Sequence, residues 1–445
     1  MTSPYQGYVY AYPHKTAYRP LDPAPSLRSV WEHEDKSALF LYLHIPFCEM
    51  RCGFCNLFTR TGASEDLTDA YLSALERQAS ATADALGDAA FATAAFGGGT
   101  PTYLTAAELD RLCDIASRFA PLGSVPLGVE TSPATATPDR LRVLRDRGTT
   151  RISIGVQSFV DAEARAAVRP QKRAEVDAAL DAIRDAAIPV LNIDLIYGIA
   201  GQTAESWRYS LDTALSWKPE EVYLYPLYKR PLTGLFRLGR DWDDHRLALY
   251  RQGRDHLLAA GYEQVSMRMF RLPVSSVGDT APVEPAAGDR AVPPAGGTEY
   301  CCQTDGMVGL GCGARSYTSE LHYSFEYAVG ATEVRAIIDD YVRADSFGTA
   351  RVGFRLDAAE RRRRHLVQSL LQASGLDRAA YRARFGTDAM DDFPDDLKGF
   401  ADREWLHVGP DTLRLTPEGL AYSDAIGPSL FSSDVRALMD AYEAR

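Results

Sequence analysis

The pattern of apolar and polar positions predicts strands alternating with helices between Leu39 and about Leu258. Short runs of β-branched and aromatic residues are each followed by a longer amphipathic stretch, and this unit occurs six times. The predicted strands are Leu39–Ile45, Ala90–Phe96, Leu127–Thr131, Arg151–Val156, Val190–Tyr197 and Glu221–Pro226. The predicted helices are Leu67–Leu86, Ala106–Ala120, Pro138–Asp146, Arg173–Ala186, Ala204–Ser216 and Asp243–Ala260. This alternation indicates right-handed βαβ crossovers and a parallel sheet of an α/β fold.

Six units are fewer than the eight of a closed (β/α)8 barrel. The pattern therefore favours an open, partial barrel or a doubly wound sheet, and both place ligand sites at the carboxyl ends of strands. Four polar or glycine-rich segments directly follow predicted strands: His44–Cys55, Gly97–Tyr103, Gln157–Ser158 and Gly198–Thr203. We expect the chemistry of the protein to lie among them.

The rest of the chain divides by composition. Residues 1–37 are expected to form an N-terminal strap ahead of a barrel over residues 38–270. Residues 271–298 are rich in Pro, Gly and Ala and predict a mobile insertion. Residues 299–350, dense in Gly and Cys, are expected to close the barrel. Residues 351–445 predict a small, mostly helical C-terminal domain, with a strand and turn near Leu413–Gly419 that favour a winged-helix-like arrangement.

Charge and hydropathy limit the partners and the cellular location that we expect for the protein. The chain has 48 Lys+Arg and 60 Asp+Glu, a net charge of −12, and no dense basic stripe, so we expect no nucleic-acid partner. No apolar run approaches the roughly 20 residues of a membrane span, and the N-terminus has no apolar signal core. These features predict a cytoplasmic protein without a membrane partner.

The strongest chemical signal is Cys48-x3-Cys52-x2-Cys55, directly after the first predicted strand. Three thiolates at this spacing can bind three irons of a [4Fe–4S] cluster and leave the fourth iron open. A zinc site with His44 as the fourth ligand is an alternative, because structural zinc normally has four protein ligands. Three buried structural cysteines are a second alternative.

The sequence LYLHIPFCEMRCGFCNLF around these cysteines resembles the signature of the radical S-adenosylmethionine (SAM) superfamily. Its flanks narrow the resemblance to the branch of oxygen-independent coproporphyrinogen III oxidases (HemN-like proteins) and their relatives, which include radical SAM methyltransferases and cyclopropanases. The resemblance continues in order through Gly97–Thr102, Glu130–Pro133, Arg151–Phe159 and Asp194–Gly198, and it includes a HemN-like C-terminal domain. It implies a partial (β/α)6, TIM-like radical SAM barrel.

The resemblance also implies two cofactors, a [4Fe–4S] cluster and SAM. Cys48, Cys52 and Cys55 would ligate the cluster. An electron from a donor such as flavodoxin or ferredoxin would cleave SAM to a 5′-deoxyadenosyl radical, so the cofactors would supply the reactive chemistry and the protein its position.

By the same resemblance, ten residues are expected to bind SAM, and Tyr42 and Glu130 are also candidates for catalysis. The absent Cβ atoms of Gly98 and Gly99 would admit the methionine end of SAM. An unpaired Asp194 in its apolar run would be costly, so a bound partner is expected there. For the glycine run the alternative is a tight turn. Glu130 and Arg169 could instead be surface charges, and Tyr42 could be an ordinary strand aromatic. The full set is Tyr42, Phe54, Gly98, Gly99, Thr100, Glu130, Gln157, Arg169, Asp194 and Ile196.

Two departures from the relatives favour one reaction over the others. The oxidases carry Gly-Cys-Asn after the third cysteine, where this chain has Asn56-Leu57-Phe58, and a haem-chaperone element is replaced by Tyr300–Asp305. We therefore expect methyl or methylene transfer from a second SAM to an sp2 carbon of a small-molecule substrate, as C-methylation or cyclopropanation. Coproporphyrinogen-type decarboxylation and a non-enzymatic haem-binding chaperone are the alternatives.

Further residues suggest substrate contacts or plain packing. The strap segment Tyr8–Tyr18 holds four tyrosines with His14 and Lys15, and could cover a planar or anionic substrate or serve only as structure. Cys301, Cys302 and Cys312 could bind metal, donate hydrogen or pack in a turn, and packing is favoured. Cys113 is expected in a helix core, and Arg361–Arg364 on a solvated helix face.

Overall fold

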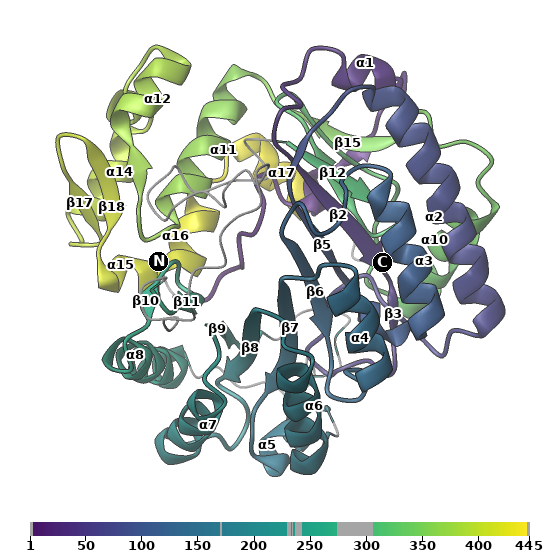
Figure 1. Cartoon of the computed structure of the whole chain (residues 1–445). Coiled ribbons are helices and arrows are strands. Elements are labelled where there is room, and N and C mark those ends of the chain that lie inside the picture. The colour runs from purple at the N-terminus through teal and green to yellow at the C-terminus, as the bar shows by residue number, and fades with distance from the viewer. Residues whose placement is uncertain are drawn as a thin grey trace, which may run out of the picture.

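The computed structural model describes residues 3–169, 171–228, 233, 235, 243–273 and 306–442. Its centre is a sheet with six neighbouring parallel strands in chain order (Figure 1). These strands are β2 (Leu39–Ile45), β5 (Phe91–Gly98), β6 (Leu127–Thr131), β7 (Arg151–Gln157), β8 (Val190–Tyr197) and β9 (Glu221–Pro226). The predicted α/β fold with a parallel sheet is confirmed, and four of the six strands have the predicted bounds.

Helices on the outside of the molecule connect consecutive strands (Figure 1). They are α2 (Glu65–Leu86), α3 (Ala106–Ser117), α4 (Pro138–Asp146), α6 (Arg173–Asp185), α7 (Ala204–Ser216) and α8 (Asp243–Ala259), all predicted to within a few residues. Polar caps set their starts: the Ser64 side chain accepts from Leu67 N, and Thr105 with Glu108 forms a capping box. The short helix α5 (Asp161–Ala166) was not predicted.

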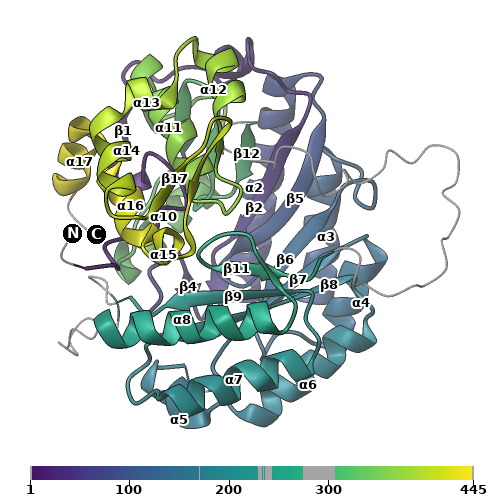
Figure 2. The ribbon, with the colours of Figure 1, turned by 90° about the vertical axis from the view of Figure 1, so that its left-hand side faces the viewer.

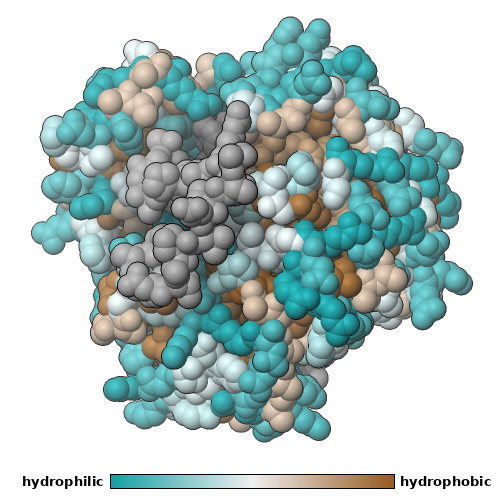
Figure 3. Space-filling view, in the orientation of Figure 1, coloured by the Kyte–Doolittle hydropathy of each residue, from teal (hydrophilic) through white to brown (hydrophobic). Residues whose placement is uncertain are grey.

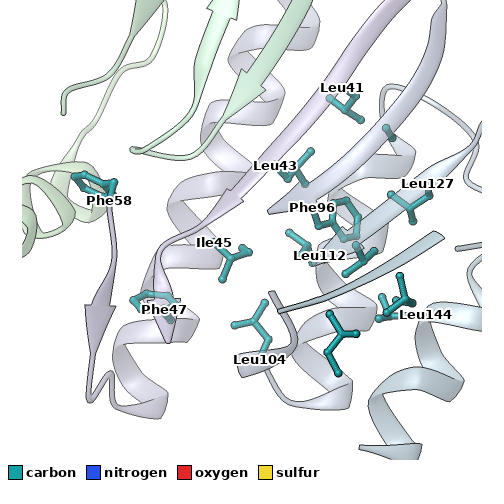
Figure 4. Close-up of a cluster of buried hydrophobic side chains, with 14 of the residues drawn as sticks. Leu41, Leu43, Ile45, Phe47, Phe58, Phe96, Leu104, Leu112, Leu127 and Leu144 are labelled. Atoms are coloured by element: carbon teal, nitrogen blue, oxygen red, sulfur yellow. The ribbon is translucent and has the colours of Figure 1, made fainter. Parts of the chain in front are cut away.

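The main core lies between the parallel strands and these helices. Along β2, the buried side chains of Leu39, Leu41, Leu43 and Ile45 alternate with Phe40, Tyr42 and His44. In Figure 4 the leucines of β2 gather with Phe96, Leu112, Leu127 and Leu144 from neighbouring strands and helices. Because strand side chains alternate between faces, the other face of the sheet carries the polar positions.

One further parallel strand and several antiparallel strands extend the sheet beyond the six that were predicted. On one side β12 (Met307–Leu310) pairs parallel to β2, and β13 (Arg315–Tyr317), β14 (Leu321–Ser324), β15 (Val352–Arg355) and β1 (Arg19–Pro20) continue the sheet. On the other side β11 (Met269–Arg271) pairs with β9 and β10 (Glu263–Gln264) with β11. Helix α10 (Ala331–Arg343) lies against α2. Residues 274–298 of the expected insertion, with Cys301 and Cys302, lie outside the described residues.

The C-terminal region is mostly helical, as expected, and has its own apolar cluster. Its helices are α11 (Ala358–Leu370), α12 (Arg378–Phe385), α13 (Ala389–Asp392), α14 (Pro394–Ala401), α15 (Pro417–Ala421), α16 (Ser423–Ser429) and α17 (Ser433–Asp440), with strands β16 (Leu376–Asp377), β17 (Leu406–Val408) and β18 (Thr412–Leu415). Figure 2 shows these helices stacked above α8.

Two predictions for this region need correction. The strand near Leu413 is present, but a helix follows it in place of a turn, because Thr416 caps the helix and Pro417 suits its first position. Arg364 does not lie on a solvated face. It is buried, and its Nη1 donates to Thr318 O and contacts His322 Nε2, both at 2.9 Å.

The N-terminal strap runs between the polar face of the sheet and the C-terminal region. It contains a 3-10 turn, η1 (Lys15–Ala17), and the helix α1 (Leu27–Trp31). The backbone amides of Gln6 and Gly7 donate to Asp424 O, and Tyr12 packs against Phe431. In the view of Figure 3, hydrophilic residues dominate the periphery and more hydrophobic ones are seen toward the middle. Within the described ranges, no helix is long and apolar enough to cross a membrane.

A buried ion pair joins these parts. Arg268 Nη2 lies 2.5 Å from Asp424 Oδ2, and the two side chains are 5% and 2% exposed. Tyr228 donates a further hydrogen bond to the same oxygen, and the Arg268 guanidinium lies 3.9 Å from the ring centre of Tyr8 in the strap. One carboxylate therefore holds together the sheet edge, the strap and helix α16.

Replacing Arg268 with Met should destabilise the protein strongly. The substitution leaves the Asp424 carboxylate buried without its cation, which typically costs about 3–5 kcal/mol. Urea unfolding followed by circular dichroism measures the change. Arg343→Met is the matched control, since Arg343 pairs with Asp340 on the surface and should matter little. Equal, small effects at the two positions would contradict the importance of the pair.

Candidate active site

The three cysteines of the motif lie on the segment that leaves the carboxyl end of β2. Cys48 ends the short strand β3 (Phe47–Cys48), which pairs with β4 (Arg60–Thr61), and Cys52 and Cys55 lie in the loop between them. All three thiols are free and half-buried. Thr100 Oγ1 donates to Cys48 Sγ at 3.4 Å, and Arg169 Nη1 donates to Cys52 Sγ at 3.1 Å. Donors aimed at sulfur suit thiolates that ligate iron.

Three free thiols in this loop can each bind a different iron of a [4Fe–4S] cluster. In the described part of the chain, no three His, Cys, Asp or Glu side chains are placed to hold one metal ion together. Thiolates of a [4Fe–4S] cluster bind different irons, so they stand further apart than the ligands of one ion. Burial raises the pKa of the Cys48 thiol to about 12, so iron must displace its proton on binding.

His44, the fourth ligand of the zinc alternative, is engaged elsewhere. Its Nε2 lies 3.1 Å from Phe58 O, and its Nδ1 lies 3.4 Å from Tyr42 Oη. A Cβ atom at Gly98 or Gly313 would lie 2.4 or 2.3 Å from the ring. Burial lowers the pKa of His44 to about 4. His44 is therefore a neutral packing residue between two glycines.

The glycine run after β5 is set by close approaches. Gly98 has φ +110°, and its N–H donates to Glu130 Oε2 at 3.1 Å. A Cβ atom at Gly99 would lie 2.6 Å from Phe47 O and 3.0 Å from Cys48 Sγ. A side chain at this position would push the cysteine loop away from the sheet. The glycine run is therefore needed for the close approach of the loop and does not serve only as a tight turn.

Two acidic side chains on the polar face have raised pKa values. Burial, with a smaller contribution from Asp194, raises the pKa of Glu130 to about 7. Burial likewise raises the pKa of Asp194 to about 6, although Asn192 Nδ2 donates to it at 2.7 Å. Glu130 lies deep in the protein and yet keeps exposed surface, which leaves it accessible to a ligand. Acidic groups perturbed in this way are typical of functional sites.

Gln157 and Arg169 close the site from the end of β7. Gln157 has φ +68° at a register shift between β7 and β8, an unusual backbone conformation that often marks functional residues. Arg169 Nη2 donates to Gly155 O at 2.7 Å while its Nη1 reaches Cys52. The cysteine loop meets this segment directly, because Gly53 N donates to Ala167 O at 3.2 Å.

Apolar residues of the predicted set lie in a separate small cluster. Phe54 packs with Ile196, Ile199 and Leu227 in this cluster, next to the cysteine loop. The structure thus places Tyr42, Glu130, Gln157 and Asp194 on β2, β6, β7 and β8, with Arg169 on the segment after α5 and an apolar patch beside the cysteine loop.

The sequence analysis missed a polar network on the same face of β7, β8 and β9, nearer the amino ends of these strands. Arg151 pairs with Glu221 at 2.6 Å, and Asn192 Nδ2 donates to Ser153 Oγ at 3.2 Å. The two-residue spacing of Arg151 and Ser153 on β7, and of Asn192 and Asp194 on β8, could have indicated this network, because alternate residues of a strand share one face. Arg315 on β13 also faces this region, and no sequence pattern marked it.

The remaining cysteines behave as packed thiols where the structure describes them. Cys312 is fully buried and its Sγ lies 3.9 Å from Tyr71 Oη. Cys113 is fully buried in α3, as predicted.

Comparison with known proteins identifies the two parts of the chain. Residues 42–214 match the radical SAM superfamily, and residues 356–422 match the HemN C-terminal domain. The oxygen-independent coproporphyrinogen III oxidase of Paracoccus denitrificans is 30% identical over 344 residues, which cover 75% of this chain and 73% of that protein.

Other relatives match over shorter lengths. The heme chaperone HemW of Bacillus subtilis is 33% identical over 44% of this chain and 52% of its own length. The oxygen-independent coproporphyrinogen III oxidase of Salmonella typhimurium is 31% identical over 60% of this chain and 61% of its own. The chain thus spans between half and two thirds of the length of these two relatives.

A solved structure shares the whole fold. Coproporphyrinogen III oxidase (HemN) from Escherichia coli, described as a radical SAM enzyme, superimposes with a TM-score of 0.76 at 23% identity and covers 98% of both chains. The partial, TIM-like barrel and the helical C-terminal region are therefore of HemN type. The chain belongs to the radical SAM superfamily, in the HemN-like branch of oxygen-independent coproporphyrinogen III oxidases and their relatives, whose cofactors are a [4Fe–4S] cluster and SAM.

Proposed function

We propose that Cys48, Cys52 and Cys55 ligate the cluster and that the polar carboxyl ends of β2 and β5–β8 bind SAM. Once bound there, the cluster and SAM would supply radical chemistry through a 5′-deoxyadenosyl radical. Two observations support this. Thr100 and Arg169 donate hydrogen bonds to two of the sulfurs, and the glycine run joins Glu130 to the cysteine loop, because Gly98 N donates to Glu130 and the next residue lies against Cys48.

Two charged side chains could bind opposite ends of the methionyl group of SAM, one its ammonium and the other its carboxylate. Among the described residues, Glu130 accepts a hydrogen bond only from Gly98 N, and it keeps exposed surface, so it can accept from the ammonium of SAM. Arg169 lies at the Cys52 sulfur and can orient a carboxylate beside the cluster. Phe54 and Ile196 offer the apolar surface that an adenine ring needs.

The proposed reaction is oxidative decarboxylation of a carboxylate-bearing small molecule, as in coproporphyrinogen III oxidation. The 5′-deoxyadenosyl radical would take a hydrogen atom from the substrate, and the substrate radical would release CO2 and pass one electron to an external acceptor, which leaves a carbon–carbon double bond. The observation that carries this proposal is the polar, accessible inward face beside the cysteine loop, within a chain similar to oxidases of this name. An external one-electron donor such as flavodoxin or ferredoxin would reduce the cluster. These relatives favour decarboxylation over the methyl transfer expected from the sequence.

Methyl or methylene transfer with a second SAM is a second candidate, favoured by the segment after Cys55. The oxidases' Gly-Cys-Asn is replaced here by Asn56-Leu57-Phe58, and these residues have local structural contacts. Phe58 O is bonded by His44, and Asn56 O accepts from the Tyr327 hydroxyl at 3.1 Å.

Products distinguish these candidates. With the anaerobically reconstituted, reduced enzyme, coproporphyrinogen III and SAM, we expect 5′-deoxyadenosine with CO2 and no S-adenosylhomocysteine, measured by mass spectrometry. S-adenosylhomocysteine together with 5′-deoxyadenosine would favour methyl transfer. Stoichiometric haem binding without SAM cleavage would contradict both reactions and favour a chaperone of the HemW kind.

Removing any one cluster cysteine should abolish stable iron binding. Cys48→Ala, Cys52→Ala and Cys55→Ala each take away one of three thiolates, and iron and sulfide content per chain after reconstitution measures the loss. Cys113→Ala is the matched control, because Cys113 is buried in helix α3 and should leave the iron content unchanged. Full iron content in a Cys52→Ala protein would refute the ligand assignment.

SAM binding should weaken as the pH falls below about 7. Burial raises the pKa of Glu130 to about 7, and only the ionised carboxylate can pair with the SAM ammonium. The affinity should also fall above about 8, where α-amino groups lose their proton. Anaerobic equilibrium dialysis measures the profile, with iron content checked at each pH.

The control for this profile is Glu130→Gln, which keeps the size of the side chain and removes its titration. This variant should bind SAM roughly 10-fold or more weakly at neutral pH, since a charge-assisted hydrogen bond is lost. Its affinity should no longer fall as the pH drops from about 8 to about 6.5. An acid limb identical in the two proteins would show that Glu130 is not the titrating contact.

A further inference from the structure

Arg315 differs from two other arginines in the interior of the protein. Arg151 pairs with Glu221 at 2.6 Å and Arg268 pairs with Asp424 at 2.5 Å. Arg315 has no carboxylate partner among the described residues. Arg315 is half-buried. A guanidinium partly removed from water without an anion is costly, so such a group usually has a ligand or a partner.

The contacts of Arg315 leave donor capacity unused. Its Nη1 donates to Tyr10 Oη at 2.8 Å, and its guanidinium lies 4.7 Å from the centre of the Tyr10 ring. Its Nε is buried and has no hydrogen-bond acceptor. A guanidinium has five N–H donors in a planar fork that matches a carboxylate. One neutral hydroxyl satisfies only a small part of that fork.

The backbone of the sheet brings Arg315 to the active-site face. Gly309 of β12 pairs with Tyr42 of β2, and a Cβ atom at Gly309 would lie 2.0 Å from Arg315 O. Only glycine allows β13 to approach this closely. Arg315 consequently lies near enough to Tyr42 and His44 to act on both electrostatically.

The strap adds aromatic surface and a second cation to this place. Lys15 Nζ lies 5.8 Å from the centre of the Tyr10 ring and 3.5 Å from that of Tyr327. Tyr10 therefore stands between two cations, Arg315 and Lys15, and its ring packs edge-on against that of Tyr8. A cationic, aromatic-lined position beside Tyr42 fits an anion attached to a planar or apolar body.

We propose that Arg315 binds a ligand carboxylate next to Tyr42, with Tyr10 and Lys15 of the strap flanking it. This subsite deepens the proposed function and rests on it. Two ligands of such an enzyme offer a carboxylate, the substrate and the methionyl group of a second SAM. The chemistry at Arg315 is the same for both, and the experiment separates them.

The test compares the reconstituted protein with its variants Arg315→Gln, Arg315→Lys and the surface control Arg343→Gln, all with iron content verified. The first probe is coproporphyrin III, whose carboxylates are free, against its tetramethyl ester, which has none. Binding is followed by fluorescence quenching under anaerobic conditions. The second probe is SAM itself, with the number of molecules bound per chain determined by equilibrium dialysis.

A substrate subsite predicts that Arg315→Gln binds the free acid roughly 10- to 100-fold more weakly and the ester unchanged. A second-SAM subsite predicts one bound SAM fewer, with coproporphyrin binding unchanged. Arg315→Lys keeps the charge without the fork and should lie between. The inference is overturned if Arg315→Gln and the wild type agree in SAM stoichiometry and in their response to both porphyrins, including a shared lack of binding.

The outcome is separable from that of the proposed function. A wild type that forms no CO2 from coproporphyrinogen III, while Arg315→Gln still loses carboxylate or SAM binding, would refute the reaction and support the subsite. A wild type that decarboxylates the substrate, with Arg315→Gln unchanged in all binding, would support the reaction and refute the subsite.

Discussion

The buried ion pair between Arg268 and Asp424 is the interaction on which the closed arrangement of this protein depends. Arg268 lies directly before β11 at the edge of the sheet, and Asp424 lies on α16, more than 150 residues later. The Asp424 carbonyl also accepts from the strap amides of Gln6 and Gly7. Because a buried charge is tolerated only beside its partner, the strap and C-terminal region are fixed relative to the sheet edge.

That closure matters because the covered face of the sheet is polar. The helix-covered face is filled by apolar side chains, whereas the opposite face carries Glu130, Arg151, Asp194 and their neighbours. The strap places Tyr8 against Tyr225 and Tyr10 against Arg315, so it supplies the wall that the open sheet lacks. The strap thus covers part of the polar face that the open sheet would otherwise expose.

The charges of this interior are organised in two layers. The deeper layer is neutralised within the protein, as in the pair Arg151–Glu221. Nearer the carboxyl ends, Glu130 and Asp194 lack ion pairs among the described residues, and burial raises their pKa values toward neutrality. Charges that the protein leaves uncompensated are those available to ligands, which is why the cofactor and substrate proposals both rest on this upper layer.

The sequence by itself determined the repeating unit, the parallel sheet and the cysteine motif, because strand and helix periodicity and ligand spacing are local properties. Only the tertiary structure decided where Arg315 and Arg364 lie, since a charged residue is read as solvated unless distant segments bury it. It also decided that His44 packs between Gly98 and Gly313 rather than serving as a ligand. These outcomes depend on contacts between segments far apart in the chain, such as β2 with β5 and the turn before β13, and α11 with β14, and no local pattern encodes them.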